Sequence, residues 1–160
     1  MHIKKSNNLL LGGCVVLLMA LCWLSISSPI RFDRERKHRE QAVIASLLKI
    51  RAAQAAYHTQ HGTYAPSIDS LVTNRLISKQ TAIIPYSNGR KFLIKTAIVT
   101  GADGNAVRLI ECGASYDDYL YGLDSNETEQ LTRQANENGQ YAGLKIGDLT
   151  TPDNNAGNWE

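Results

Sequence analysis

The chain of 160 residues has little cysteine, three residues in all, and its charges of either sign nearly balance. Cys14 and Cys22 lie inside a hydrophobic run, which leaves Cys112 alone in the rest of the chain. A lone cysteine excludes an internal disulfide and a zinc site built on cysteines. No histidine lies beside Cys112 in the sequence to activate it, so we expect a buried structural thiol.

Strong basic character is also missing, since 17 Lys and Arg face 15 Asp and Glu, and this argues against a nucleic-acid partner. Also absent are a glycine-rich phosphate loop, a Gly-x-Ser-x-Gly elbow and a cysteine–histidine pair. His58 and His61 have no third metal ligand at a suitable spacing. We expect Asp117, Asp118 and Asp124 in an exposed loop rather than as acid–base catalysts. The sequence therefore predicts no enzyme, cofactor, metal or small-molecule substrate.

One long apolar run is present. No charged residue occurs between Lys5 and Arg31, and Leu9 to Ile26 is almost wholly apolar. At about 1.5 Å per residue this run spans about 27 Å, close to the thickness of a bilayer core. We predict a cytoplasmic stub over residues 1–8 and a transmembrane helix over 9–28, with the lipid bilayer as a partner. A cleaved signal peptide and a lipoprotein anchored at Cys14 are the alternatives.

A charged segment follows over residues 29–42. Pro29 is expected to break or kink the first helix, and a second helix is expected from Phe32 to about Gln60. Its first turns carry oppositely charged side chains four residues apart, such as Asp33 and Lys37. This pattern is typical of a solvated stalk, and a patch that binds lipid headgroups is the alternative.

The helix becomes amphipathic beyond Gln41. Its apolar residues gather on one side at the helical period, which predicts that this side packs on a sheet: Val43, Ile44, Leu47, Leu48, Ile50, Ala55 and Tyr57. Arg51 and Gln54 fall within the same stripe. Since a buried polar group without a partner is costly, we expect both to reach strand backbone or water.

The remaining residues predict a small α+β head over 43–149, followed by a polar tail over 150–160. Ser67 should cap a short helix that ends near Val72. Alternating residues predict strands over 91–100 and 106–112, joined by a hairpin at 101–104. A short helix is expected near the tyrosines at 116–121, another from Ser125 or Asn126 to Asn136, and a last strand over 141–149. The predicted fold is a long N-terminal helix packed on a small antiparallel sheet.

One group of residues resembles type IV pilins and the pseudopilins of type II secretion: Arg51, Gln54, Tyr57, Gly62, Tyr64, Ser67 and Leu71. In that family a hydrophobic helix continues into an amphipathic half on an antiparallel sheet, and a Gly-x-Tyr turn closes the first loop. The chain is also similar to short membrane-anchored bacterial proteins that end in Asn-Trp-Glu. The prepilin cleavage motif is absent, because cleavage after Gly13 would put Leu18 where the family has a glutamate.

The two flanks of the apolar run give conflicting orientations. Lys4 and Lys5 draw the N-terminus inward, whereas Arg31, Arg34 and Arg36 crowd the other flank and by count favour a cytoplasmic head. The pilin resemblance implies instead that the head lies outside the cytoplasm. We therefore predict a single-pass protein of the inner (cytoplasmic) membrane with an extracytoplasmic soluble domain.

The resemblance implies a pilin-like structural or assembly subunit of a bacterial envelope or secretion apparatus, with self-association or other protein partners. The alternative is a membrane-tethered adaptor that does not polymerise. Its expected contact residues are Tyr116, Tyr119, Tyr121 and Trp159, because exposed aromatics are enriched at interfaces; covering the sheet's second face is their other possible role. Asp103 and Asp153 resemble parts of a pseudopilin calcium loop, but ordinary turns are the favoured interpretation.

Overall fold

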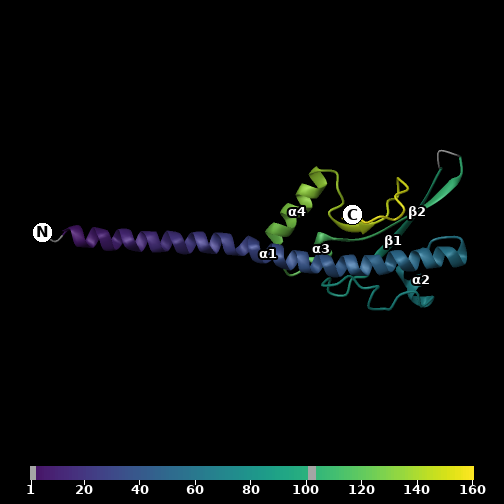
Figure 1. The fold of residues 1–160 in the computed structure, drawn as a ribbon, viewed down its shortest axis with the longest axis horizontal. Helices are drawn as coiled ribbons and strands as arrows, with labels where there is room; N and C mark the ends of the chain where they lie inside the picture. Colours follow the sequence, from purple (N-terminus) through teal and green to yellow (C-terminus); the bar gives the residue numbers. More distant parts are fainter. Residues whose placement is uncertain (1–2, 101–103) are drawn as a thin grey trace. The chain divides into compact units, whose positions relative to one another are not determined.

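The computed structural model describes the backbone of residues 3–100 and 104–160, and the side chains of these residues except 3–9 and 24–29. The chain divides into two compact units, Met1–Arg36 and Lys37–Glu160. Each unit is described by itself below. Figure 1 labels the elements along the chain.

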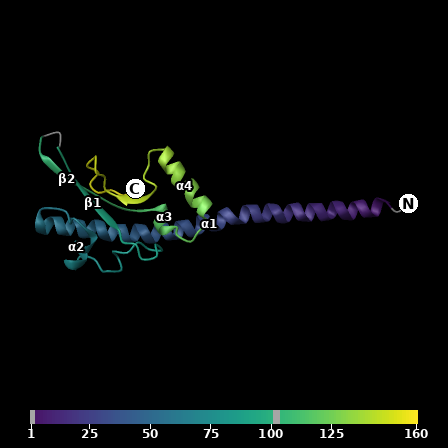
Figure 2. The same cartoon turned by 180° about the vertical axis from the view of Figure 1, so that it is seen from behind.

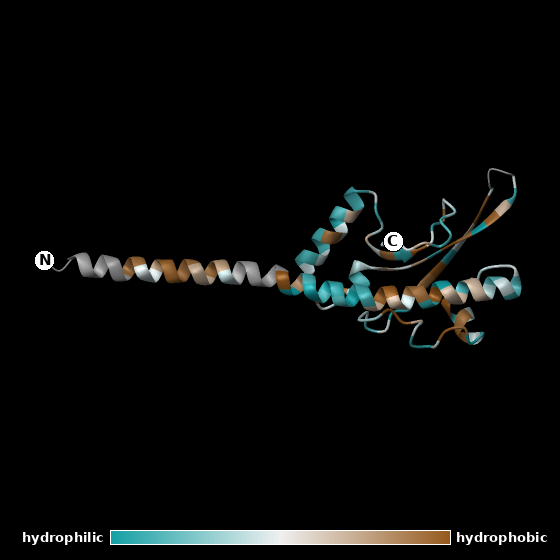
Figure 3. Ribbon diagram, in the orientation of Figure 1, coloured by the Kyte–Doolittle hydropathy of each residue, from teal (hydrophilic) through white to brown (hydrophobic). Residues whose placement is uncertain are grey.

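The first unit is helical throughout its described part. It belongs to α1, which runs from Ile3 to His61. Of the break or kink predicted at Pro29, the break does not occur: a proline removes only one N–H donor, and the helix continues through position 29. Every described side chain from Leu10 to Trp23 is exposed, and hydrophobic residues dominate this stretch in Figure 3.

The predicted transmembrane segment, 9–28, includes side chains outside the described set. Among the residues that the structure describes, none of the helices combines the length and the apolar character needed to cross a bilayer.

The C-terminal part of α1 contributes a stripe to the core of the second unit. Val43, Leu47, Ile50, Ala53 and Gln54 are buried, at the three- and four-residue spacings of one helix face. Four members of the predicted stripe are not buried: Ile44 and Tyr57 are partly buried, and Leu48 and Ala55 are exposed, because they lie beside this face rather than on it. Figures 1 and 2 show α2 (Ile68–Thr73) on one side of this part of α1, and α4 (Ser125–Glu137) with the C-terminal segment on the other.

The predicted cap of α2 is confirmed. The backbone N–H of Ser70 donates to the side-chain oxygen of Ser67, which satisfies a donor that the first helical turn leaves open. Ile68 and Leu71 then point into the core.

A three-stranded antiparallel sheet in the order β1-β2-β3 forms the rest of the core. Its strands are β1 (Leu93–Thr100), β2 (Ala106–Ser115) and β3 (Gly143–Ile146). The α+β class and the hairpin strands are thus confirmed, while the hairpin tip at 101–103 lies outside the described residues. One face of the sheet is buried, with Ile94 opposite Cys112 and Cys112 opposite Ile146. Ile98, predicted on the same face as Ile94, is 64% exposed because it lies toward the hairpin end.

Several boundaries differ from the predictions. β1 begins at Leu93 instead of Lys91, and β2 continues to Ser115 instead of ending at Cys112. Asp124, rather than Ser125 or Asn126, caps α4, because its carboxylate accepts from the N–H groups of Asn126 and Glu127. The last strand covers only 143–146, within the predicted 141–149. It ends where Gly147 takes a positive φ of 71°.

The C-terminal segment, predicted as a separate polar tail, belongs to the second unit. Gly157 forms a bridge with Ile146, and the N–H of Asn158 donates to the carbonyl of Lys145 over 3.0 Å. The side chain of Asn158 in turn accepts from the N–H of Lys145. The tail therefore covers the open edge of β3. Its polar composition alone did not indicate this pairing.

Candidate interaction site

Arg39, a half-buried side chain early in the second unit's part of α1, contacts several segments of this unit. Its guanidinium donates to two backbone carbonyls, of Tyr119 over 3.1 Å and of Tyr121 over 2.8 Å. It also lies over the ring of Tyr86, 4.8 Å from the ring centroid. One cation therefore joins α1, the end of α3 (Tyr116–Tyr119) and the loop before β1. We call Arg39, Tyr86 and Tyr121 the arginine–tyrosine surface.

Tyr86 holds an unfavourable backbone conformation, with φ at 63°. A bulky residue in the left-handed region costs free energy that the surrounding structure must offset. The next residue, Ser87, is buried and anchors the loop, because its hydroxyl donates to the carbonyl of Ile84 over 2.7 Å. The Tyr86 hydroxyl also lies 3.4 Å from Nδ1 of His38. The ring stays 43% exposed, so the loop fixes an aromatic group at the surface.

The position of α3 is fixed by its N-terminal capping box. Oδ2 of Asp118 accepts from the N–H and the hydroxyl of Ser115, and Oδ1 lies 2.7 Å from the guanidinium of Arg90. Partial burial opposes ionisation of Asp118, but the hydrogen bonds from Arg90 and Ser115 outweigh it and lower the pKa of this carboxyl. Asp118, expected in an exposed loop, is thus a structural anchor for the segment that carries Tyr121.

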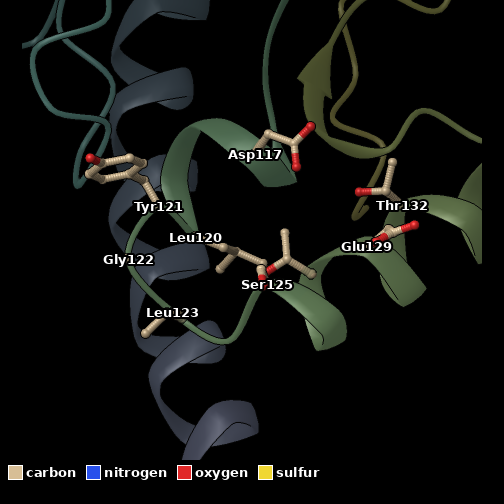
Figure 4. A pocket seen from close by; sticks show the side chains of 9 residues that line it. Asp117, Leu120, Tyr121, Gly122, Leu123, Ser125, Glu129 and Thr132 are labelled. Atoms are coloured by element: carbon tan, nitrogen blue, oxygen red, sulfur yellow. The ribbon is translucent and has the colours of Figure 1, made fainter.

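A shallow pocket of about 490 Å³ adjoins this segment. Figure 4 shows its lining side chains on α3, the following loop and the first turns of α4. Tyr121 lies on the opposite side of α3 from Glu129 and Thr132. The pocket therefore borders the arginine–tyrosine surface, with apolar walls from Leu120 and Leu123.

The four predicted contact residues do not form one surface. Tyr119 is completely buried, Tyr116 and Trp159 are partly buried, and Tyr121 is 57% exposed. The Trp159 ring packs over Gly157, where an added Cβ would lie 2.4 Å from it. Tyr121 alone of the four is an exposed candidate. Arg39 and Tyr86 were missed, and the only sequence signal for Tyr86 was the turn-forming run Pro85 to Gly89 around it.

The pilin-like motif residues have structural roles around the first loop. Gln54 is fully buried; its amide donates to the carbonyl of Ala65 over 3.1 Å and accepts from the N–H of Ala65 over 2.8 Å. The predicted partner, strand or water, is corrected to loop backbone. Arg51 forms an ion pair with Glu160 at 2.7 Å. The remaining motif residues are the partly buried Tyr57, Tyr64 and Ser67, the exposed Gly62 and the buried Leu71.

The described residues give little support for a metal-binding site. His58 stacks on Tyr64, and His61 stacks on Tyr57, with ring centroids 4.7 Å and 4.2 Å apart. No group of three His, Cys, Asp or Glu side chains in the described part of the chain is arranged to hold a metal ion. Asp103, one of the two residues compared with a calcium loop, lies outside that part. Asp153 accepts from the N–H of Asn155 over 2.9 Å, as in an ordinary turn.

Cys112 is buried on the core face of β2, as predicted. Burial, followed by the nearby Glu111 carboxylate, raises the pKa of its thiol to about 12. The thiol therefore stays protonated at physiological pH and is not an activated nucleophile.

Comparisons of the chain with models of protein families, with curated proteins and with solved structures find no match. The pilin resemblance stays a prediction.

Proposed function

We propose that the chain is a membrane-anchored, pilin-like structural or assembly subunit of a bacterial envelope or secretion apparatus. It acts by lateral packing of its N-terminal helix against neighbouring helices, while the head is held at the membrane surface. In this proposal the C-terminal part of α1 packs on the three-stranded sheet, and the head is extracytoplasmic.

The observation that carries the proposal is the exposed apolar surface of α1 from Leu10 to Trp23. Its large side chains are between 46% and 76% exposed. A helix that is apolar on all sides is stable only when an apolar medium or other protein surrounds it. A bilayer with neighbouring helices supplies both.

A second support comes from the head. α1 continues from this apolar stretch to His61, and its C-terminal part buries Val43, Leu47 and Ile50 in the second unit. One helical element thus contributes both the apolar stretch and a core stripe of the head.

The native cysteines provide the test. Cys14 and Cys22 are exposed on α1, whereas Cys112 is buried. Variants that retain only Cys14 or only Cys22 should stay in the membrane pellet after alkaline carbonate extraction and form disulfide-linked dimers on mild oxidation. A control that carries its only cysteine at the exposed head position 79 should crosslink less.

Two results would count against this function. Recovery of the full chain in the soluble fraction would overturn the anchor. A chain that is integral to the membrane but stays monomeric under oxidation at both positions would overturn lateral packing and favour the second candidate.

The second candidate is a membrane-tethered adaptor, favoured by the arginine–tyrosine surface. Tyr86 and Tyr121 are both exposed and both contact Arg39, and an exposed aromatic group on a strained loop is a feature that binding surfaces use. A photo-crosslinking residue placed at Tyr121 should then capture the same protein in cells as one placed at Tyr86, and one at the exposed Thr73 should not.

A further inference from the structure

We propose that Arg31 and Arg34 bind the phosphodiester groups of anionic phospholipids, such as phosphatidylglycerol. This inference rests on the proposed membrane anchor and names a partner for it. It decides between the two interpretations of the charged segment, a solvated stalk and a headgroup-binding patch, and it narrows the patch to two side chains of the first unit.

The two arginines form a pair on one face of α1. Residues three apart on a helix are neighbours, separated by about 4.5 Å along its axis. Both side chains are exposed. A guanidinium presents a planar fork of donors that matches two phosphate oxygens, so two adjacent forks can hold one or two lipid phosphates.

Their position along the helix suits headgroups. The apolar run ends at Ile26, so Arg31 and Arg34 follow it by about 8 Å and 12 Å at the rise of an α-helix. The polar layer on each side of a bilayer core is about 5–8 Å thick. Helical side chains lean toward the N-terminus, here toward the apolar run, so the long arginine side chains reach back into this layer.

The charge surroundings of the two arginines also favour an external anion. Among the described residues neither arginine forms an ion pair; of the adjacent carboxylates, Asp33 pairs with Arg36 at 3.1 Å, and Glu35 is partly buried. By contrast, Arg90 pairs with Asp118 and Lys91 with Asp69. Two exposed guanidinium groups with no carboxylate partner in the described part of the chain, next to an apolar helix surface, fit an anionic lipid surface better than bulk water.

The test uses the full chain in uncharged maltoside micelles with an equimolar mixture of phosphatidylglycerol and phosphatidylcholine of the same acyl chains. Native mass spectrometry gives the ratio of the two retained lipids. Near a membrane each basic residue contributes several-fold to anionic binding, so the wild-type chain should favour phosphatidylglycerol roughly tenfold or more. R31Q/R34Q should bring the ratio near one, and R31K/R34K should keep part of the preference.

The matched control is R75Q/R133Q, which removes the same charge from exposed positions of the head and should keep the wild-type ratio. An equal ratio for wild type and R31Q/R34Q overturns the proposal, as does loss of preference in the control. Loss of bound phosphatidylglycerol on adding inorganic phosphate at millimolar concentration would also overturn it, since the site would then bind free phosphate. A chain that passes carbonate extraction but shows no lipid preference refutes this inference alone, whereas a soluble chain refutes the anchor.

Discussion

Gln54 and Ala65 are joined by two hydrogen bonds between a buried side-chain amide and the backbone of a loop 11 residues further on. The amide behaves like one residue of a β-ladder, because it satisfies both the N–H and the carbonyl of Ala65. This pair fixes where the chain reverses after α1, and it lets an apolar helix stripe contain a polar residue at no net loss of hydrogen bonds.

Gln54→Ala should lower the free energy of unfolding by roughly 2–5 kcal/mol, because it leaves two buried backbone groups unsatisfied and opens a cavity. Chemical denaturation of the full chain in detergent, followed by circular dichroism, measures the change. Gln60→Ala, at an exposed position in the last turn of the same helix, should change it by less than about 0.5 kcal/mol. Equal effects of the two substitutions would contradict the role assigned to Gln54.

Gly147→Ala should destabilise the head far more than Gly139→Ala, although both glycines have positive φ, 71° and 65°. A Cβ at Gly147 would lie 2.1 Å from the carbonyl oxygen of Ile110, whereas nothing lies within 4 Å of one at Gly139. We expect about 1 kcal/mol at Gly139, for the backbone conformation alone, and more at Gly147. Thermal unfolding of the two variants in parallel measures the difference, and similar midpoints would refute the close contact.

Cys112 should resist alkylation until the head unfolds. In a variant with Cys14 and Cys22 replaced by serine, maleimide at pH 8 should leave the folded chain unlabelled and modify it fully in denaturant, as read by mass spectrometry. The raised pKa, about 12 against an ordinary 9.0, means that the folded state binds this proton more tightly. Its contribution to stability is therefore fully present below pH 9 and is lost as the pH rises toward 12. Rapid labelling of the folded chain would show that the thiol is accessible.

Asp148 should make the turn over residues 148–151 sensitive to acid. The Thr150 hydroxyl, the N–H of Thr150 and the Lys145 ammonium hold its pKa well below the usual range, with N–H and ammonium distances of 2.8 Å and 3.0 Å. Because the pKa of Asp148 is lower in the folded state, the carboxylate stabilises the fold fully above its ordinary pKa of 3.8. This contribution to stability is lost as the pH falls through the folded-state pKa. Wild type should therefore exceed Asp148→Asn in stability at pH 6 and approach it near pH 2. Asp69→Asn, in a more exposed pair with Lys91, should show a smaller pH dependence; a constant difference at Asp148 would contradict the prediction.

The sequence predicted elements whose signals are local. The helical period after Gln41, the cap at Ser67 and the alternation on both sides of the hairpin each depend on neighbouring residues, and each gave an element of the right type. The predicted ends of elements were wrong where a single residue determines the end. Asp124 caps α4 in place of the adjacent serine, and Gly143 and Gly147, both with positive φ, shorten the last strand.

The candidate site was harder to predict, because its geometry arises between distant segments. Nothing in the sequence around Arg39 indicates that it lies over Tyr86 and donates to carbonyls 80 and 82 residues along the chain. A helix as short as α3 has too few residues for a period to separate the buried Tyr119 from the exposed Tyr121. The tail was likewise unpredictable, since its bridge to β3 uses backbone groups, which every sequence has, and a lone Asn158 side chain does not indicate its distant partner Lys145.

The ion pair between Arg51 and Glu160 joins residues that are 109 positions apart. During synthesis the ribosome therefore completes α1 long before β3 and the segment that covers it exist. The apolar stripe at Val43, Leu47 and Ile50 must wait unpaired through that interval. The stripe can pack only after the C-terminal segment has left the ribosome, so folding of the head is completed after synthesis rather than during it.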